Sequence, residues 1–387
     1  MKICILTPRF PFPECGGDLL RINNIARYLK SKGHYLILVS YIEDSPDIDY
    51  AKSLYDEVYV VYRHKWRSAF YSACFLLRGL PIQCGYYYSK SFKHVLDEVV
   101  KKEQPDLFLP HLLRMIPFLQ APERRERTIV EMTDALSKTY SLATKAKGNR
   151  LLKFIYMFEK SLMCHYEESV LRSYPKVVLV SQSDIDYFQA KYDYKFKSLA
   201  LHTNGVETKD QRVSYSPGKI CFIGHMQSLQ NQDAVIHFVK NIFPLILNEE
   251  PNTKFYVVGA HPPKNILKLA NGNNIFVTGF VDNLIATIED SCIAVAPVRI
   301  AAGIQNKVLV AMGCHVPVVL TPLIAQSIPE LKDGVNCYIK DDDNEFAACC
   351  VNLMRDKMQR EVIADAGYAV VKNHYSWEEK LQGYETL

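Results

Sequence analysis

A glycine loop followed by a lysine lies between two apolar runs late in the chain. Residues 295–319 read VAPVRIAAGIQNKVLVAMGCHVPVV, which predicts a strand, a loop, a helix from about Gln305 to Gly313 and a second strand. Ligands of parallel sheets bind at the loop after such a strand, and the free amides at a helix start favour anions. Gly303 and Lys307 could therefore form a phosphate cradle, the alternative being a simple turn beside a solvated lysine.

A glycine pair follows the first predicted strand in the same way. Residues 2–7 are an apolar run, prolines and Gly16-Gly17 interrupt the chain, and apolar residues then recur with helical spacing from Leu19 to Leu29. Because glycine lets a ligand approach the backbone amides closely, this loop could contact a phosphate or a sugar. The alternative is a plain helix start.

Such loops connect strands to helices, and the sequence contains two series in which strands and helices alternate. The pattern indicates an α/β protein with two doubly wound, Rossmann-like domains, residues 1–200 and residues 201–372. The polar, turn-rich residues 199–218 would connect the two domains. Domains of this kind would leave a cleft between the carboxyl ends of their strands, and the glycine loops would face it.

Positive charge is concentrated in the first half of the chain. The net charge is +4, but residues 1–200 carry 30 Lys and Arg against 22 Asp and Glu. This excess fits an anionic membrane surface, an anionic acceptor or simply a solvated face. Basic and aromatic residues alternate over 62–93, where they could lie on lipid headgroups or form a helical core segment with a tyrosine-rich loop. They belong to no nucleic-acid-binding module, so no nucleic-acid partner is expected.

The eleven cysteines include no spaced CxxC pair, which argues against a disulfide framework and a zinc site and fits a reducing cytoplasm. The start, MKICILTP, runs directly into a strand, so no signal peptide is expected, and no apolar run reaches the ~18 residues of a spanning helix. The acid run at 341–343 is interpreted as a solvated loop and not as a metal site. We expect a cytoplasmic protein, or one held peripherally at the inner face of the cytoplasmic membrane.

The motifs occur in an order that resembles the GT-B glycosyltransferases, family 4 in particular, and within it the bacterial sugar transferases of envelope polysaccharide synthesis. The resemblance covers nearly the whole chain and implies two domains facing each other across a cleft, with a helix over about 373–387 that crosses back onto the first. The matching stretches are Gly16-Gly17 with Arg21, residues 204–207 (NGVE), residues 222–234 (FIGHMQSLQNQDA), residues 295–313, Glu330 with Gly334, and Ser376-Trp377.

The resemblance implies transfer of a sugar from a nucleotide-sugar donor, such as a UDP- or GDP-sugar, to a glycan or lipid-linked acceptor in bacterial surface polysaccharide synthesis. It also implies retention of the anomeric configuration and no cofactor or metal. Donor contacts would come from Gly16, Gly17, Gly224, Gly259, Gly279, Gly303, Ile304, Gln305, Asn306 and the place of Val310.

The catalytic residues implied by the resemblance are Lys307, Arg299 and His111. Charge on the departing diphosphate must be stabilised, and the two cations could do this together with amides at the glycine loops. His111 would lie against the donor sugar, a packing role being the alternative. On the acceptor side the candidates are Arg21, Glu131 and Asp134, and for Asp134 a helix cap is the alternative.

Two acids that the family usually carries are missing from the donor loop. The matching positions hold Ala302 and Val310. Val310 cannot accept a hydrogen bond from the nucleotide ribose, whereas Lys307 can still contact a phosphate. Two alternatives to a transferase therefore stay open: a non-catalytic homologue that acts as a scaffold or partner, and a sugar-nucleotide epimerase with the same fold.

Overall fold

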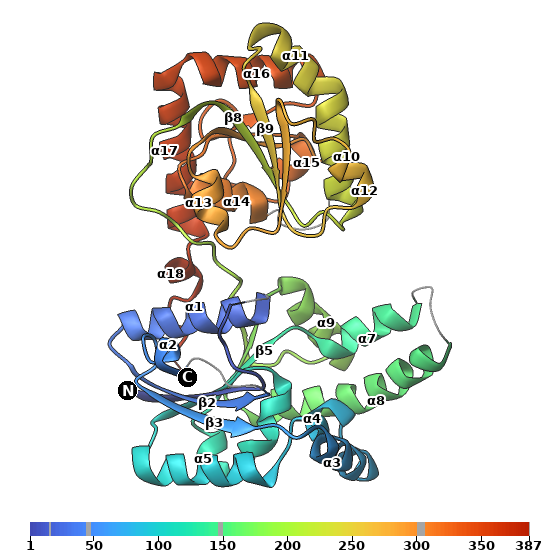
Figure 1. The fold of residues 1–387 in the computed structure, drawn as a ribbon. Helices are drawn as coiled ribbons and strands as arrows, with labels where there is room; N and C mark the ends of the chain where they lie inside the picture. The colour runs from blue at the N-terminus through green and yellow to red at the C-terminus, as the bar shows by residue number, and fades with distance from the viewer. Residues whose placement is uncertain (15–16, 44–47, 146–149, 300–305, 387) are drawn as a thin grey trace. The chain divides into compact units, whose positions relative to one another are not determined.

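The strands of the structure pair in parallel, and the helices that join them lie on both faces of the sheets (Figure 1). The structure is a computed structural model that describes residues 1–14, 17–43, 48–145, 150–299 and 306–386. The chain divides into two compact units, Met1–Asn204 with Leu381–Leu387, and Gly205–Lys380. The predicted α/β class with two doubly wound units is confirmed.

The first unit contains a four-stranded sheet in the order β3-β2-β1-β4 and a three-stranded sheet in the order β5-β6-β7. Two parallel bridges, Phe108 with Thr128 and His111 with Glu131, connect β4 to β5. The strands are β1 (Lys2–Thr7), β2 (Tyr35–Ile42), β3 (Glu57–Tyr62), β4 (Leu107–Pro110), β5 (Ile129–Thr133), β6 (Lys176–Leu179) and β7 (Leu199–Leu201).

The helices of the first unit cover both faces of its sheets. In Figure 1 α1 lies on one face of the β1–β4 sheet and α5 on the other, which explains why the interior residues of β1 and β2 are buried and almost entirely apolar. None of the described helices is long and apolar enough to cross a membrane. The helices are α1 (Gly17–Ser31), α2 (Ile48–Ala51), α3 (Lys65–Leu77), α4 (Ile82–Tyr86), α5 (Lys90–Glu103), the 3-10 helix η1 (Leu113–Phe118), α6 (Pro122–Arg125), α7 (Leu136–Lys145), α8 (Arg150–Ser173) and α9 (Gln182–Tyr192).

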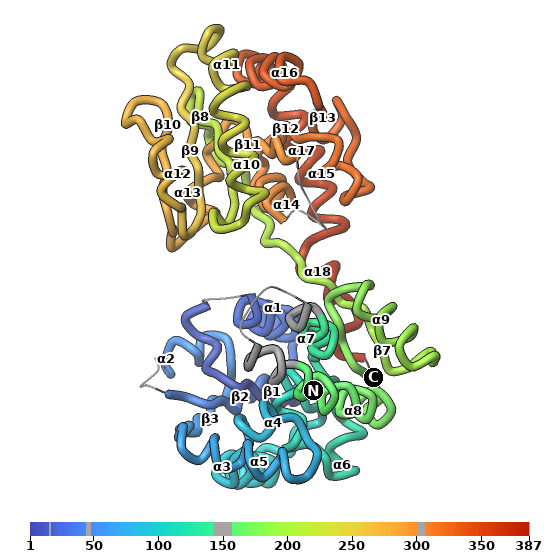
Figure 2. Tube along the Cα trace, turned by 90° about the vertical axis from the view of Figure 1, so that its right-hand side faces the viewer, coloured from blue at the N-terminus to red at the C-terminus, as the bar shows by residue number. Residues whose placement is uncertain are grey.

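The second unit contains one six-stranded sheet in the order β10-β9-β8-β11-β12-β13, which Figure 2 shows from β10 at one side to β13 at the other. Its strands are β8 (Ser216–Ile223), β9 (Lys254–Val258), β10 (Ile275–Gly279), β11 (Ser291–Ala296), β12 (Val318–Leu320) and β13 (Tyr338–Ile339). Its helices are α10 (Leu229–His237), the π-helix η2 (Phe238–Ile242), α11 (Phe243–Glu249), α12 (Lys264–Leu267), α13 (Leu284–Ile288), α14 (Asn306–Gly313), α15 (Pro322–Ala325), α16 (Asp343–Arg355), α17 (Lys357–His374) and α18 (Trp377–Lys380).

The predicted strand, loop, helix and strand of residues 295–319 correspond to β11, α14 and β12. The two strands pair in parallel, with Ala294 opposite Val318 and Ala296 opposite Leu320. The loop between β11 and α14 therefore lies at the carboxyl end of a central strand. This is the position at which ligand loops of doubly wound sheets occur.

The end of the chain packs on the first unit. Lys176 Nζ donates to the backbone carbonyls of Gly383, Tyr384 and Thr386 at 2.8–2.9 Å. Tyr384 is fully buried. The return to the first unit starts at Leu381, later than the predicted start at about residue 373, because α17 and α18 belong to the second unit.

Candidate functional site

Three neighbouring strands of the second unit end in glycines whose backbones touch. The Gly224 amide donates to the Val258 carbonyl at 3.0 Å, and the Gly259 amide donates to the Gly279 carbonyl at 3.2 Å. A Cβ on Gly259 would lie 1.8 Å from the Gly224 carbonyl oxygen, and a Cβ on Gly224 would lie 2.7 Å from Asn231 Nδ2. The packing of these loops on one another therefore requires glycine at 259, and a side chain at 224 would have to displace that of Asn231.

Lys307, at the start of α14, brings a largely buried positive charge to this group of loops. Its Nζ donates to Asn231 Oδ1 and lies 4.8 Å from the centroid of the Phe222 ring. Burial lowers the pKa of Lys307 to about 8. No carboxylate among the described residues pairs with it, so its charge is available to an anion.

Arg299, the second predicted cation, has an internal partner. Its Nε donates to Asp233 Oδ2 at 3.1 Å and its Nη2 donates to Asp233 Oδ1 at 2.6 Å. Half of the Arg299 side chain is exposed, and Asp233 offsets its charge. Asn231 and Asp233 both lie in the first turns of α10, so the two predicted cations are held by one helix.

The other predicted donor residues differ in how the structure accounts for them. Asn306 is exposed at the start of α14, and Val310 is partly buried and packs on the apolar core of the second unit. Gly17 is the first residue of α1, and nothing lies within 4 Å of a Cβ placed there. Gly16, Gly303, Ile304 and Gln305 lie outside the described residues.

In the first unit, the predicted acceptor residues Arg21 and Glu131 form a buried ion pair. Arg21 Nε and Nη2 donate to the Glu131 carboxylate at 2.8 and 3.0 Å, and Arg21 Nη1 donates to Asn204 Oδ1 at 2.9 Å. Glu131 also accepts from the Tyr384 hydroxyl at 2.6 Å and from Thr133 Oγ1 at 3.0 Å. The pair therefore anchors the end of the chain, and an acceptor contact by either residue stays a prediction.

The Glu131 carboxylate is ionised inside this network although it has no solvent contact. Burial by itself would raise its pKa, but the Arg21 guanidinium and the Tyr384 hydroxyl hold the pKa below its usual range. This balance makes the network dependent on both partners, since either charge alone would be buried without compensation.

His111 lies directly after β4, next to this network. It is fully buried, and among the described residues neither of its ring nitrogens has a hydrogen-bond partner. Burial lowers its pKa to about 4 against the opposing effect of Glu131, so the ring is neutral near pH 7. The packing alternative accounts for its burial, whereas its unsatisfied nitrogens favour a polar ligand.

Asp134 follows β5 and is exposed, and no hydrogen bond to its side chain occurs within the part of the chain that the structure describes. Partial burial and the nearby Asp184 carboxylate raise its pKa. The start of α7 is bonded by Asp184, whose Oδ2 accepts from the Ala135 amide at 3.4 Å. The helix-cap alternative for Asp134 is therefore not what the structure contains, and its carboxylate stays available.

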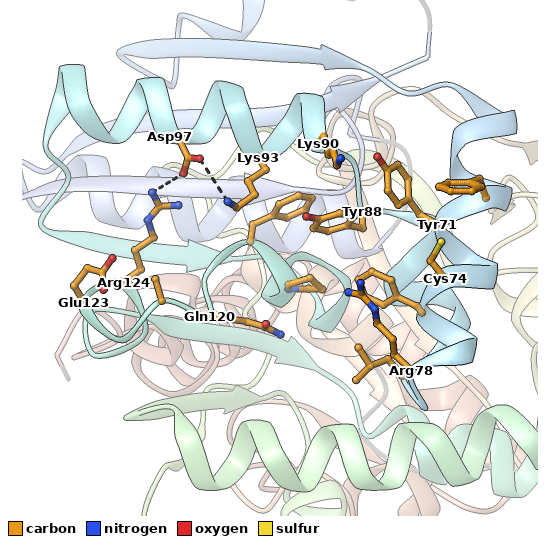
Figure 3. A pocket seen from close by; sticks show the side chains of 16 residues that line it. Tyr71, Cys74, Arg78, Tyr88, Lys90, Lys93, Asp97, Gln120, Glu123 and Arg124 are labelled. Carbon is orange, nitrogen blue, oxygen red and sulfur yellow. Dashed lines mark hydrogen bonds and ion pairs between the residues drawn. The ribbon is translucent and has the colours of Figure 1, made fainter.

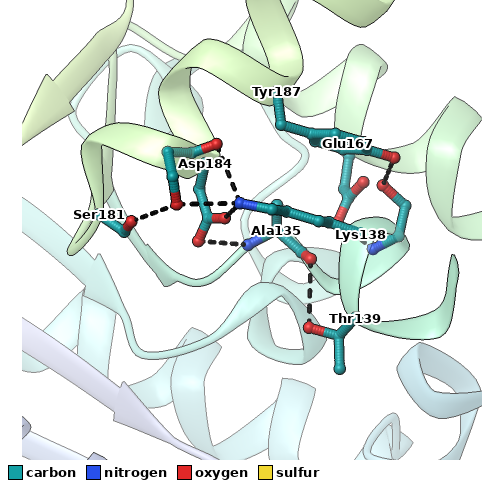
Figure 4. Close-up of polar contacts among 9 residues, drawn as sticks. Ala135, Lys138, Thr139, Glu167, Ser181, Asp184 and Tyr187 are labelled. Atoms are coloured by element: carbon teal, nitrogen blue, oxygen red, sulfur yellow. Dashed lines mark hydrogen bonds and ion pairs between the residues drawn. The ribbon is translucent and has the colours of Figure 1, made fainter. Parts of the chain in front are cut away.

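A polar group around Lys138 lies at the ends of β5 and β6 (Figure 4), and the sequence suggested only a helix cap for its members Ser183 and Asp184. Lys138 Nζ donates to Asp184 Oδ1 at 2.6 Å and to the carbonyl and hydroxyl of Ser183, both at 3.0 Å. Glu167 is buried beside it and accepts from the Ser137 amide at 3.1 Å. A lysine in the first turn of a helix carries no distinctive sequence signal, because its partner lies 46 positions away.

The acid run at 341–343 has structural partners. Asp342 is the N-cap of α16 and accepts from the amides of Asn344 and Glu345 at 2.9 and 3.1 Å, while Asp343 lies 2.9 Å from His237 Nε2. Within the described residues, no three His, Cys, Asp or Glu side chains are grouped so that they could hold a metal ion.

Comparison with known proteins finds a family match over part of the chain and a shared fold over nearly all of it. Residues 217–356 match the family described as Glycosyl transferases group 1. An uncharacterized 44.6 kDa protein in the cps region of Klebsiella pneumoniae is 22% identical, covering 97% of this chain and 96% of its own. HepE of Anabaena, in complex with UDP, has a TM-score of 0.60 at 13% identity over 99% of this chain and 98% of its own.

Sucrose-phosphate synthase from Thermosynechococcus elongatus gives the same TM-score of 0.60, at 12% identity over 99% of this chain and 97% of its own. At such identities these likenesses show the fold alone, while the family match falls on the unit that holds the glycine ends and Lys307. The structural likenesses show that the chain has the GT-B fold of two Rossmann-like units, and residues 217–356 of its second unit match the Glycosyl transferases group 1 family.

Proposed function

We propose that the chain transfers a hexosyl or related sugar from a nucleotide-sugar donor, held by the second unit, to a glycan or lipid-linked acceptor in bacterial surface polysaccharide synthesis. The observation that carries the proposal is Lys307, a largely buried cation at the start of a helix whose hydrogen-bond partner is the neutral amide of Asn231. A diphosphate would supply the missing negative charge. HepE, a similar structure, is bound to UDP, and the cps-region relative fits a role in surface polysaccharide.

The proposed chemistry stabilises the leaving diphosphate without a metal ion. Lys307 and the free amides at the start of α14 would bind the phosphates. The lysine carries a full positive charge and the amides carry a partial positive charge, and the two lie next to each other. Arg299 would contribute less, since Asp233 already offsets its charge. Retention of the anomeric configuration is part of this proposal and follows from the family resemblance.

In the first unit, the groups proposed to meet the sugar substrates are His111 and Asp134. The neutral His111 ring has unsatisfied nitrogens that could hydrogen-bond a sugar hydroxyl. Asp134 has an exposed carboxylate at the end of β5. An acceptor hydroxyl could donate to that carboxylate and be oriented by it.

We also propose that the enzyme works at the inner face of the cytoplasmic membrane, where α3 would contact the lipid. Trp66, Phe70 and Leu77 are 68, 62 and 88% exposed, and their spacing of four and seven residues places them along one side of the helix. Lys65 and Arg67 flank them, and residues 58–96 contain neither Asp nor Glu. Exposed apolar residues beside unopposed cations are typical of helices that lie in a lipid interface.

The donor proposal is tested by thermal unfolding with and without UDP, GDP and UDP-sugars, each measured both in the absence and in the presence of a chelator. We expect one nucleotide class to raise the Tm, and Lys307→Ala to abolish the rise. Lys357→Ala is the matched control, because Lys357 is an exposed lysine at the start of α17 and outside the glycine loops. Loss of the rise on chelation would contradict the metal-independent mechanism.

A non-catalytic homologue is the second candidate, and Val310 favours it. An aliphatic side chain packed on the core cannot replace the acid that binds the nucleotide ribose in the family. Release of UDP or GDP from a nucleotide sugar on addition of a membrane fraction separates the two candidates. A Tm rise with nucleotide but no turnover with any donor would favour the non-catalytic homologue.

A further inference from the structure

A cavity of about 670 Å³ lies in the first unit between α3, α5 and residues 117–124 (Figure 3). Its volume is in the range of small-molecule sites, roughly 300–1,000 Å³. Its apolar wall is aromatic: the Tyr88 ring stacks on Phe118 with centroids 5.3 Å apart and lies 5.4 Å from Phe75. The cavity shares no lining residue with the donor loops or with the network around Glu131.

Two cations without a carboxylate partner line the cavity. Within the part of the chain that the structure describes, neither Arg78 nor Lys90 forms an ion pair, and both are exposed at the cavity mouth. Figure 3 shows Arg78 extending from the end of α3 over the cavity toward Gln120. Residues 58–96, which include both cations, contain no acid.

The acids that line the cavity do not neutralise the positive charge of Arg78 and Lys90. Asp97 is shared by two cations, Arg124 Nη2 at 2.6 Å and Lys93 Nζ at 3.8 Å. Glu123 lies beside Arg124, away from Arg78, at the opposite side of the view in Figure 3. The Arg78 side of the cavity therefore presents aromatic surface and unpaired positive charge together.

The cavity adjoins the face of α3 that we propose contacts lipid. Phe70 belongs to that face and also lines the cavity, and Tyr71 and Cys74 line it from the next positions around the helix. A hydrocarbon chain leaving the bilayer along α3 would thus reach the aromatic wall directly. A charged group at its end would meet Arg78 and Lys90.

We infer that this cavity binds a phosphate carried on a hydrocarbon chain, with the phosphate on Arg78 and Lys90 and the chain against Phe75, Tyr88 and Phe118. The inference rests on the proposed membrane-side transferase, because a lipid-linked acceptor and an anionic phospholipid both have this chemistry. It gives the first unit a lipid-phosphate site that is separate from the donor site of the second unit.

Cys74 provides the measurement, since it is a partly exposed thiol in the cavity wall. The full chain is treated with a maleimide and the alkylation rate of Cys74 is followed by mass spectrometry, with Cys349, a partly exposed thiol of α16, as the internal reference. Farnesyl phosphate should slow Cys74 alone, whereas farnesol and inorganic phosphate at the same concentration should not. Equal protection by farnesol would overturn the phosphate site.

Lys90→Glu and Lys65→Glu form a matched pair of variants. Both reverse one charge at the start of a helix, where an acid is tolerated, but only Lys90 lines the cavity. Lys90→Glu should weaken protection by about tenfold or more, as expected for one charged hydrogen bond, and Lys65→Glu should leave it unchanged. An equal loss in both variants would overturn the inference in favour of general surface charge.

Two further measurements are made. The first identifies which kind of lipid phosphate binds in the cavity, and the second tests this inference separately from the proposed function. If short-chain phosphatidylglycerol protects Cys74 and farnesyl phosphate does not, the cavity binds membrane lipid. If farnesyl phosphate protects Cys74 and phosphatidylglycerol does not, the cavity binds a lipid-linked acceptor. Protection by neither overturns the site. The nucleotide-induced Tm rise is measured on the same samples, so its absence with Cys74 protection intact would count against the donor proposal alone.

Discussion

Lys307 donates a hydrogen bond to the side-chain oxygen of Asn231, a residue 76 positions earlier in the chain. The Asn231 amide nitrogen is itself fixed, because it donates to the His225 carbonyl at 2.9 Å. The asparagine therefore orients the lysine without neutralising it. A buried ammonium held in this way is poorly stabilised until an anion binds.

Nucleotide affinity should fall as the pH rises through about 8. At that pH the buried Lys307 amine loses its proton, and only the protonated amine attracts a diphosphate. In the absence of nucleotide, the unfolded chain keeps this proton up to the ordinary pKa of 10.5, so the free energy of unfolding should increase between about pH 8 and 10.5. Titration calorimetry with UDP across this range measures the first effect. Lys307→Arg, which keeps its charge, should remove the pH dependence.

Lys307→Ala should cost more nucleotide affinity than Arg299→Ala. Losing one charged hydrogen bond costs about 1.5–3 kcal/mol, or roughly 10- to 150-fold in Kd. For Arg299 we expect a loss of less than about tenfold, because a phosphate must first displace Asp233 from the guanidinium. Asp233→Asn serves as the control and should tighten binding slightly by freeing Arg299. A larger loss for Arg299→Ala would show that the ion pair opens in the complex.

Glu131→Ala should destabilise the first unit by about 3–5 kcal/mol, since it leaves the buried Arg21 guanidinium without its counter-ion. Tyr384→Phe removes one hydrogen bond to the same carboxylate and should cost about 1.5 kcal/mol. Glu168→Ala, which breaks an exposed pair with Arg172, should change stability by about 0.5 kcal/mol or less. Urea unfolding measures all three, and equal effects would refute a structural role for the buried pair.

The stability of the first unit should fall between about pH 4.5 and 7 because of Glu167. Burial raises the pKa of this carboxyl from 4.5 to about 7, so in that interval the folded state holds a proton that the unfolded chain has released. The stabilising contribution of the protonated form is complete below the lower value and is lost as the pH passes the higher one. Glu167→Gln, measured by Tm against pH, should flatten this part of the profile. An unchanged profile would show that another group titrates there.

The exposed face of α3 should control binding to lipid vesicles. Trp66→Ala with Leu77→Ala should greatly reduce co-flotation with vesicles that contain phosphatidylglycerol, because both side chains are mostly exposed and would enter the interface. Leu229→Ala with Met358→Ala, two equally exposed apolar residues of the second unit, is the matched control. Flotation that is unaffected by the α3 pair, or absent in the unmodified protein, would contradict a membrane contact by this helix.

The sequence was sufficient to predict the alternation of elements. Strands such as β1 and β2 are covered by helices on both faces, and such strands must be nearly continuous apolar runs that are visible in the chain. The glycine at 259 was visible for a related reason, since packing of one loop backbone on another leaves no space for a side chain. Local sequence also located α14, which follows the loop after β11, to within one residue.

The pairing of the polar residues was decided by tertiary structure alone. Arg21 and Glu131 are 110 positions apart, Glu131 and Tyr384 are 253 apart, and no local pattern connects them. The sequence suggested that Arg21 and Glu131 could meet an acceptor, which stays a prediction, but it gave no sign that folding buries the two side chains against each other. It gave no signal for Lys138 with Asp184, because each residue type is common on helix surfaces.

The sequence by itself determined which residues could carry the chemistry, because backbone periodicity and glycine positions are local properties. Only the tertiary structure decided which charges remain available. Burial and distant partners distinguish Lys307, held by an amide, from Arg299, held by a carboxylate, although both are cations beside the same loop. Charge compensation depends on contacts between distant segments, and those contacts exist only once the chain has folded.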